Sequence, residues 1–413
     1  MVSPFMPDEA KIVAVREALP ATGAGIYLNA GSVGPLPAET ARAMTEIAEY
    51  ELTVGRGSYA AFLDVLDRMA EARAAVAAIL SADIDTVALT HSTTDGMNIG
   101  SWGHDWQRGD RAVTTNREHI AAYAPLLAVR EARGIDLEIV DIGEGGDDER
   151  ILAAFDRAIT PRTRLVSVSH VLWPTGAVMP VRAIADLAHD RGAFVLVDGA
   201  QAAGAIPVDV DAVGADAYAL SAQKWLLGPE GIGALWVSAA ANERLRPTFG
   251  GYFGYDAPGL LPPYRRFSDA RRHEVGTLHS PSVVGFARSC GWLAMYVGLD
   301  WAQRRAFALA TRLADALADL PGVRVVTPRE RMATLVTATV DGWSGETVLE
   351  ELGRRTFTIA RTIPDTEWVR FSVGFWNTEA ELDRVVALVG EIAAHTPESM
   401  PARPTLTIIG EGS

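Results

Sequence analysis

Asp198 and Lys224 are the residues of this sequence whose types and spacing most clearly suggest chemistry. Asp198 ends the apolar run 194–197, and Lys224 follows 26 residues later in the segment 221–228, Ser-Ala-Gln-Lys-Trp-Leu-Leu-Gly. An amine in apolar surroundings loses hydration, which lowers its pKa and makes it a nucleophile able to form a Schiff base. A carboxylate that keeps a pyridinium nitrogen protonated would complete a site for pyridoxal phosphate (PLP). Taken singly, Lys224 could be a surface lysine and Asp198 a helix N-cap.

A second polar group follows a predicted strand and opens a predicted helix. The segment His91-Ser-Thr93-Thr94-Asp-Gly96 supplies hydroxyl and backbone N–H groups at a helix N-terminus, where anions such as a cofactor phosphate bind. The same pattern also occurs as a simple N-cap. Ser221, at another strand end, adds a hydroxyl and favours the phosphate interpretation.

The elements that would position these groups alternate between strand and helix. Strands are predicted at 86–89, 111–114, 137–140, 164–169, 194–197, 217–220 and 233–237, and helices at 72–80, 121–133, 151–158 and 181–191. This alternation predicts an α/β fold: a large domain with a mostly parallel, seven-stranded-type sheet flanked by helices. Ligands of such sheets bind at the carboxyl ends of the strands. Polar clusters follow five of these ends, at 91–95, 118–119, 170, 198 and 221–224.

From residue 301 the pattern changes to that of a small C-terminal α+β domain. We predict a large PLP-binding domain over residues 20–265. The small domain would comprise 266–396 together with the N-terminal segment 1–19, and residues 397–413 would form a loosely ordered tail. The Pro- and Gly-rich stretch 250–263 is a candidate break, and the loop 252–264 is expected to supply variable pocket walls.

The composition narrows the class of protein. The chain has 413 residues and a net charge of −15, and an acidic protein repels phosphate backbones, which argues against nucleic-acid binding. The single cysteine, Cys290, excludes an internal disulfide and a cysteine-based metal site, and no metal is expected. The first 17 residues lack a signal-peptide core, and no apolar run approaches the ~20 residues of a membrane span. We therefore expect a cytoplasmic protein that does not contact a membrane.

Five motifs in this order resemble the class V aminotransferase family of fold-type I PLP enzymes. They are Thr93-Thr94-Asp95-Gly96, Glu118-His119, Val197-Asp198-Gly-Ala-Gln201, Ser221-x-x-Lys224 and Arg370-Phe-Ser-x-x-x-x-Asn377. The resemblance extends from about Tyr27 to about Leu388. It implies the family's fold, PLP as cofactor and a two-fold homodimer with shared sites that acts on a small amino-acid substrate. The family includes cysteine desulfurases, isopenicillin N epimerases and C–S lyases.

The resemblance also implies a role for each matching residue. Lys224 would hold PLP as a Schiff base, Asp198 would pair with the pyridinium nitrogen, and His119 would stack on the ring; these are the predicted catalytic residues. The predicted cofactor-binding residues are Thr93, Thr94, His119, His170, Asp198, Gln201, Ser221, Gln223, Lys224 and Thr277.

The resemblance gives further detail for three cofactor-binding residues and for two substrate-binding arginines. Gln201 would hydrogen-bond the ring oxygen, and Thr277 would reach the phosphate in the other subunit. Gln223 stands where most relatives have histidine; it can still donate to a phosphate oxygen but adds no charge. Arg370 would clamp the substrate carboxylate, because a guanidinium matches a carboxylate in a bidentate fashion. Arg361, nine residues earlier, could meet the same carboxylate or be a surface charge.

Other residues indicate which branch of the family this sequence resembles. A cysteine desulfurase needs a nucleophilic cysteine on a mobile loop before Arg370; none lies between residues 353 and 370, and Cys290 lies in a predicted buried helix. The segments 169–176, 102–110 and 361–370 resemble the cysteine/cystine C–S lyase branch. We therefore expect a PLP-dependent C–S lyase that cleaves a cysteine S-conjugate or cystine-like substrate by β-elimination to pyruvate and ammonia. A PLP-dependent epimerase or aminotransferase is the alternative, a protein that uses this fold only as an interaction surface stays open, and cysteine desulfurase is disfavoured.

Overall fold

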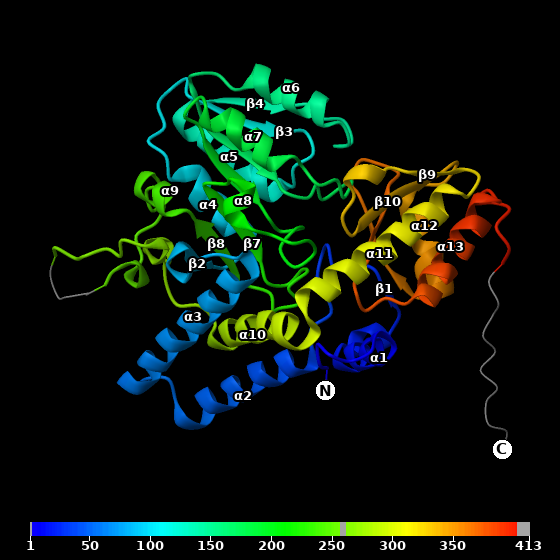
Figure 1. Cartoon of the computed structure of the whole chain (residues 1–413), viewed down its shortest axis with the longest axis horizontal. Coiled ribbons are helices and arrows are strands. Elements are labelled where there is room, and N and C mark those ends of the chain that lie inside the picture. The colour runs from blue at the N-terminus through cyan, green and yellow to red at the C-terminus, as the bar shows by residue number, and fades with distance from the viewer. Residues whose placement is uncertain (1, 257–261, 403–413) are drawn as a thin grey trace.

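The computed structural model describes residues 2–256 and 262–402. A seven-stranded sheet and a four-stranded sheet lie in different parts of the molecule, with α2, α3 and α10 on one side of the larger sheet (Figure 1). Parts of the predicted 252–264 loop and of the predicted tail 397–413 lie outside the described residues.

The large sheet has the strand order β2-β8-β7-β6-β5-β3-β4. The five strands from β7 to β4 are parallel, whereas β8 is antiparallel to both of its neighbours. Its strands are β2 (Val87–Thr90), β3 (Arg111–Thr115), β4 (Asp136–Val140), β5 (Thr163–Ser169), β6 (Phe194–Asp198), β7 (Ala217–Ser221) and β8 (Gly233–Val237). The central strands are continuous apolar runs because both of their faces are covered. The predicted α/β fold with a mostly parallel seven-stranded sheet is confirmed.

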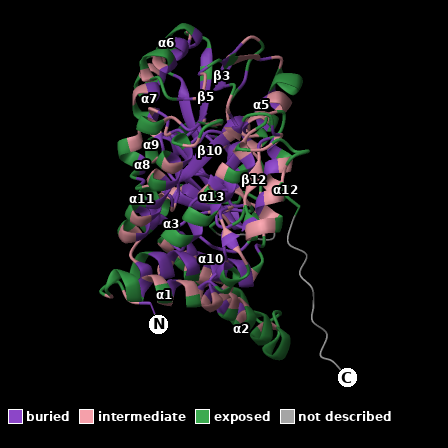
Figure 2. Cartoon of the chain, turned by 90° about the vertical axis from the view of Figure 1, so that its right-hand side faces the viewer, coloured by how far each residue is buried: buried purple, intermediate pink, exposed green. Residues whose placement is uncertain are grey.

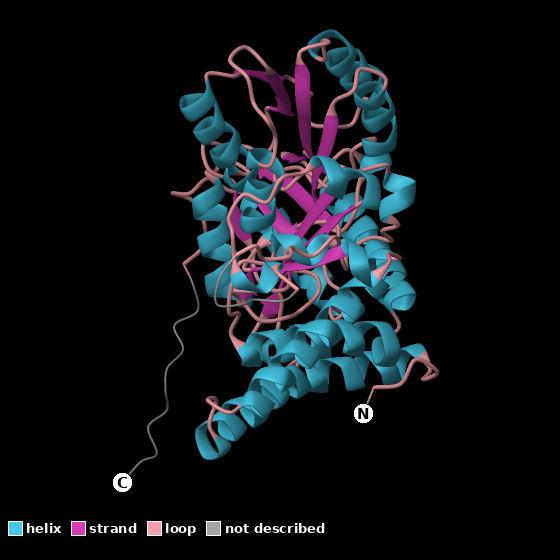
Figure 3. Cartoon of the chain, turned by 90° about the vertical axis from the view of Figure 1, so that its left-hand side faces the viewer, coloured by secondary structure: helices cyan, strands magenta, loops and turns pink. Residues whose placement is uncertain are grey.

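Helices enclose this sheet on both faces (Figure 3). One apolar core, which includes Met97, Leu126 and Phe194, joins the sheet to α4 and α5. A larger core on the other face includes Ile151, Ile184 and side chains from α3 and α10. The helices that precede β9 are α1 (Asp8–Ala18), α2 (Ala38–Val54), α3 (Tyr59–Leu80), α4 (Thr93–Trp102), α5 (Ile120–Arg133), α6 (Asp148–Ala158), α7 (Val181–His189), α8 (Val210–Val213), α9 (Ala239–Arg244), α10 (Ser280–Gly291) and α11 (Leu299–Ala318).

The second sheet is antiparallel, in the order β12-β13-β10-β9. Together with α11, α12 and α13 it encloses a separate apolar core that includes Leu313, Val336 and Leu352. Its elements are β9 (Val323–Val325), β10 (Leu335–Val340), α12 (Gly345–Thr356), β12 (Arg361–Thr362), β13 (Val369–Ser372) and α13 (Glu379–Ala393). A short pair, β1 (Ile26–Tyr27) with β11 (Thr358–Ile359), ties the N-terminal part of the chain to this region. Buried residues form the interior of both parts (Figure 2).

Helices α2 and α3 are among those that differ from the sequence prediction. The helix predicted to begin at 72 begins at Tyr59, where Ser58 accepts a hydrogen bond from Ala61 as its N-cap. The preceding helix α2 was not predicted. Both helices expose apolar side chains, among them Leu52 and Phe62, which hides the amphipathic pattern that the prediction relies on.

Candidate active site

The ends of three neighbouring parallel strands bring the predicted residues to one edge of the large sheet. Ser169 at the end of β5 is paired with Asp198 at the end of β6, and Asp198 is paired with Ala219 in β7. Ser221 ends β7, and Lys224 follows it by three residues. The edge is therefore the carboxyl edge, where the sequence predicts a ligand site.

Lys224 is partly exposed, yet protein surrounds it closely enough to remove much of its hydration. This desolvation lowers the pKa of Lys224 to about 8; the charge of Asp198 opposes the shift, and those of Arg370 and Arg361 add to it. Burial raises the pKa of Asp198, against the opposing effects of Lys224 and of the Ala200 N–H, which donates to its carboxylate at 2.9 Å.

The number of lysines also indicates that Lys224 is the candidate Schiff-base lysine. The chain contains only two, Lys11 and Lys224. Lys11 lies over the ring of Trp301, 4.3 Å from its centroid, and comes from α1 rather than from the sheet edge. Lys224 is therefore the one lysine of the chain that lies beside Asp198.

The N-terminus of α4 is joined to the end of β7 by hydrogen bonds between Thr93 and Ser221. The Thr93 N–H donates to Ser221 Oγ at 2.9 Å, and the two hydroxyl oxygens are 2.5 Å apart. Thr94 lies exposed in the same first turn, which Ser92 caps. Hydroxyls and helix N–H groups at this position suit a phosphate.

His119 is held in place by the loop between β3 and α5. Its neighbour Glu118 is buried and accepts hydrogen bonds from Thr115 Oγ1 at 2.8 Å and from the Ser169 N–H at 3.2 Å, which ties the loop to β3 and β5. The His119 Nδ1 accepts a hydrogen bond from the Ala121 N–H, and the His119 and Trp173 rings are perpendicular with their centroids 5.2 Å apart. Burial, and then the charge of Lys224, lower the pKa of His119 to about 4, so the ring is neutral at pH 7.

His170 and Gln201 have protein partners of their own. His170 Nδ1 lies 3.0 Å from the hydroxyl of Tyr218, and its backbone N–H donates to the Asp198 carbonyl. Gln201 donates one amide hydrogen to Gly31 O at 2.7 Å and accepts from Trp225 Nε1 at 2.9 Å. One amide hydrogen of Gln201 is left for a ring oxygen, so its predicted role is compatible with these contacts.

Arg361 and Arg370 come together from paired strands. They face each other in the register of β12 and β13, and Arg370 is fully buried. Arg370 donates to the Trp173 carbonyl at 2.9 Å, and the Arg361 guanidinium lies 5.5 Å from the centroid of the Trp173 ring. Burial, together with the charge of Arg361, lowers the pKa of Arg370 to about 9.

No carboxylate neutralises this arginine pair in the described part of the chain. Three polar atoms with almost no solvent exposure, Arg370 Nε, Ser372 Oγ and Trp173 Nε1, also lack a hydrogen-bond partner there. Buried polar groups without partners are costly. The region is therefore suited to an anionic ligand such as an amino-acid carboxylate.

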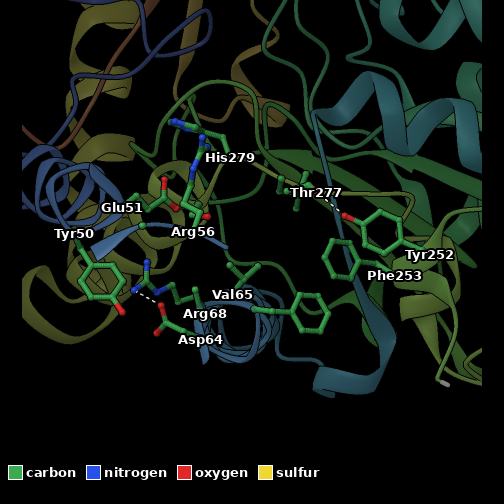
Figure 4. Close-up of a pocket in the computed structure, with 15 residues that line it drawn as sticks. Tyr50, Glu51, Arg56, Asp64, Val65, Arg68, Tyr252, Phe253, Thr277 and His279 are labelled. Atoms are coloured by element: carbon green, nitrogen blue, oxygen red, sulfur yellow. Dashed lines mark hydrogen bonds and ion pairs between the residues drawn. The ribbon is translucent and has the colours of Figure 1, made fainter. Parts of the chain in front are cut away.

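Thr277 and Gln223 do not join this group through side-chain contacts. Thr277 is exposed and hydrogen-bonds the hydroxyl of Tyr252, and both line a cavity of about 460 Å³ beside α2 and α3 (Figure 4). Gln223 accepts a hydrogen bond from Gly34 N–H with its backbone carbonyl. The roles predicted for their side chains stay predictions.

The profile of the family described as Aminotransferase class-V matches residues 26–385. The chain belongs to the class V aminotransferase family. The resemblance inferred from the motifs is thus confirmed, and so is PLP as the cofactor. The residues present fit it: Lys224 for its aldehyde, Asp198 for its ring nitrogen, and α4 with Ser221 for its phosphate.

Two curated relatives of this class V chain are named as cysteine desulfurases. A "probable cysteine desulfurase" of Methanothermobacter thermautotrophicus is 31% identical over 92% of this chain and 97% of its own length. A "cysteine desulfurase" of Dickeya dadantii is 31% identical over 68% of each chain.

Two solved structures of related enzymes are also similar to this chain. The cystine C–S lyase C-DES, in complex with cysteine persulfide, has a TM-score of 0.85 at 27% identity and covers 90% of this chain and 99% of its own. The cysteine desulfurase of Thermococcus onnurineus has a TM-score of 0.83 at 25% identity and covers 95% of this chain and 100% of its own.

One sequence prediction is wrong. The chain was expected to be a β-eliminating C–S lyase with cysteine desulfurase disfavoured, but its curated relatives are named cysteine desulfurases. The prediction relied on the missing loop cysteine and on the resemblance of segments 169–176, 102–110 and 361–370 to the C–S lyase branch. Cys290 itself is buried in α10, as predicted.

The sequence prediction missed one polar residue in the candidate active site. Ser32 lies in the loop after β1 and accepts hydrogen bonds from both Arg361 and Arg370. The only local signal is the pair of glycines, Gly31 and Gly34, close to Ser32 in the sequence.

Proposed function

We propose that this enzyme is a PLP-dependent cysteine desulfurase, which removes the sulfur atom of L-cysteine. The observation that carries the proposal is the placement of Lys224, with its lowered pKa, beside Asp198 and near two arginines that have no acidic partner in the described structure. The names of the relatives support the choice of reaction.

Different side chains of the protein bind the substrate, remove its proton and contact the cofactor ring. Arg370 and Arg361 bind the carboxylate of the amino acid and so fix its α-carbon. Lys224, with a pKa of about 8, is available as a neutral amine that removes the α-proton. His119 stays uncharged, so it can lie against a flat ring without adding charge. When bound, PLP supplies an electron sink for the negative charge that develops on the substrate carbon.

The sulfur atom leaves on an acceptor from outside the chain. Cys290 is the only cysteine, it is 1% exposed, and burial raises its thiol pKa far above the ordinary value. A thiol of this kind is a poor nucleophile. With an external thiol, the C–S bond of cysteine breaks, an S–S bond forms, and the carbon takes up hydrogen. The carbon is reduced to alanine, and the transferred sulfur is oxidised to a persulfide.

We also propose a cytoplasmic homodimer. Thr277 would reach the cofactor phosphate of the partner subunit, and its exposed position at the cavity in Figure 4 is compatible with this role. Exposed aromatic side chains at the same cavity, Tyr252 and Phe62, would be covered by a second copy. No helix among residues 2–256 and 262–402 has the length and hydropathy that a membrane span requires.

Product analysis with L-cysteine tests the reaction. Holoenzyme is incubated with L-cysteine and dithiothreitol, and alanine, pyruvate and ammonia are quantified. Alanine as the main carbon product supports a desulfurase. Pyruvate and ammonia as the main products, or no cleavage of cysteine, would contradict it. The Lys224→Ala variant serves as the inactive control.

A further inference from the structure

The loop after β1 contacts both arginines of the candidate carboxylate site through one side chain. Ser32 Oγ accepts a hydrogen bond from Arg361 Nη1 at 3.2 Å and one from Arg370 Nη2 at 3.4 Å. With both lone pairs engaged in this way, the hydroxyl can still donate its own hydrogen to an anion. The side chain is only half-buried, so that hydrogen is accessible.

Gly31 brings this loop close to Arg370. A Cβ at Gly31 would lie 2.8 Å from Arg370 Nη2 and 2.8 Å from Ser372 Oγ, so a larger residue at this position would displace these side chains. The Gly31 carbonyl accepts a hydrogen bond from Gln201 at 2.7 Å. The loop is therefore fixed to the cofactor side of the site immediately before Ser32.

Gly34 fixes the loop at its other end. Its N–H donates to the Gln223 carbonyl at 2.7 Å, and a Cβ there would lie 2.3 Å from the Lys224 carbonyl oxygen. The loop is thus held between the lysine segment of the large sheet and the arginines of the small sheet, with Ser32 facing the arginines.

We propose that Ser32 is a positioning and substrate-binding residue of the carboxylate site. It holds two like-charged guanidinium groups at a shared hydroxyl and donates its own O–H to the substrate carboxylate that binds between them. The inference rests on the proposed function, because it takes the ligand of the arginines to be an amino acid. It adds a residue that the family motifs found in this sequence do not include.

Spectroscopic titration of the holoenzyme tests this role apart from turnover. L-Alanine and L-alaninamide both present an amine to the cofactor, but only L-alanine has a carboxylate, and the cofactor absorbance reports the binding of each. Ser32→Ala should bind L-alanine about tenfold more weakly, as expected for a lost hydrogen bond to charged groups. It should bind L-alaninamide as wild type does, and Ser32→Thr, which keeps the hydroxyl, should restore L-alanine binding.

Two glycine variants provide a matched pair. Gly31→Ala should weaken L-alanine binding more than Ser32→Ala, because it displaces Arg370. Gly23→Ala should leave binding unchanged, since a Cβ there meets nothing within 4 Å. Unchanged L-alanine binding by a folded Ser32→Ala variant would overturn the inference, and so would an equal loss for both ligands. If wild type binds L-alanine but does not cleave cysteine, the proposed function fails instead.

Discussion

At the scale of single residues, the lysine that binds PLP covalently can be identified by a chemical test, because the chain has only two lysines. Borohydride reduction of the holoenzyme should attach one pyridoxyl group per chain, and peptide mass spectrometry should find it on Lys224. Lys11 is the internal control, because its amine packs on Trp301. Lys224→Ala should lose the label, the Schiff-base absorbance and activity, while PLP can still bind through its phosphate. A label on Lys11 in the wild-type enzyme would refute the assignment.

The lowered pKa of Lys224 predicts how the attachment depends on pH. Only the neutral amine attacks the aldehyde of PLP, and burial lowers the pKa of Lys224 to about 8. The rate at which apoenzyme takes up PLP covalently should therefore rise with pH through a midpoint near 8 and level off above it. Stopped-flow absorbance between pH 6 and 10.5 measures this rate. A midpoint near the ordinary lysine value of ~10.4 would show that the site does not perturb the amine.

At the scale of elements, the hydroxyl of Ser221 joins the end of β7 to the first turn of α4. Removing it should leave the Thr93 N–H without its partner and weaken phosphate binding. We expect Ser221→Ala to raise the dissociation constant for PLP about tenfold, measured by quenching of tryptophan fluorescence. Ser289→Ala is the matched control, because Ser289 is equally buried but bonds only within α10. Equal affinity in both variants would show that Ser221 does not contribute to the phosphate site.

The strands of the large sheet could be predicted from the sequence. Strands β5 to β8 were placed within one residue, because each is a short apolar run ended by polar or glycine residues. The common carboxyl edge of β5, β6 and β7 then followed from their parallel pairing, and it placed Asp198, Ser221 and the Lys224 segment correctly. The predicted domain boundaries stay predictions.

Other features depend on contacts that local sequence does not encode. Ser32 is more than 320 residues from both of its arginine partners along the chain, so no local pattern could reveal that contact. The helix α2 carries exposed apolar side chains, so its sequence lacks the usual amphipathic signal. The prediction of the branch was wrong because it relied on one missing cysteine and three short segments, whereas the similarity to a relative named as a probable cysteine desulfurase extends over 92% of this chain.

At the scale of the whole molecule, mixed dimers can show whether Thr277 acts across the interface. Lys224→Ala and Thr277→Asp are placed in separate subunits, and native mass spectrometry selects the mixed dimer. Such a dimer keeps one complete site if Thr277 serves its partner, so roughly half of the wild-type activity per dimer should return. The control places both substitutions in one subunit beside a wild-type subunit, which leaves no complete site. The opposite pattern would show that Thr277 serves its own subunit, and a monomer in solution would refute the dimer.

We propose that this enzyme removes sulfur from cysteine and passes it to a thiol outside the chain. The most direct test is the product balance of the Cys290→Ser variant, which has no cysteine at all. With L-cysteine and dithiothreitol, we expect close to wild-type rates and one alanine for each sulfur atom recovered as sulfide from the acceptor. Loss of alanine formation in a folded, PLP-loaded Cys290→Ser variant would contradict it, as would pyruvate in place of alanine.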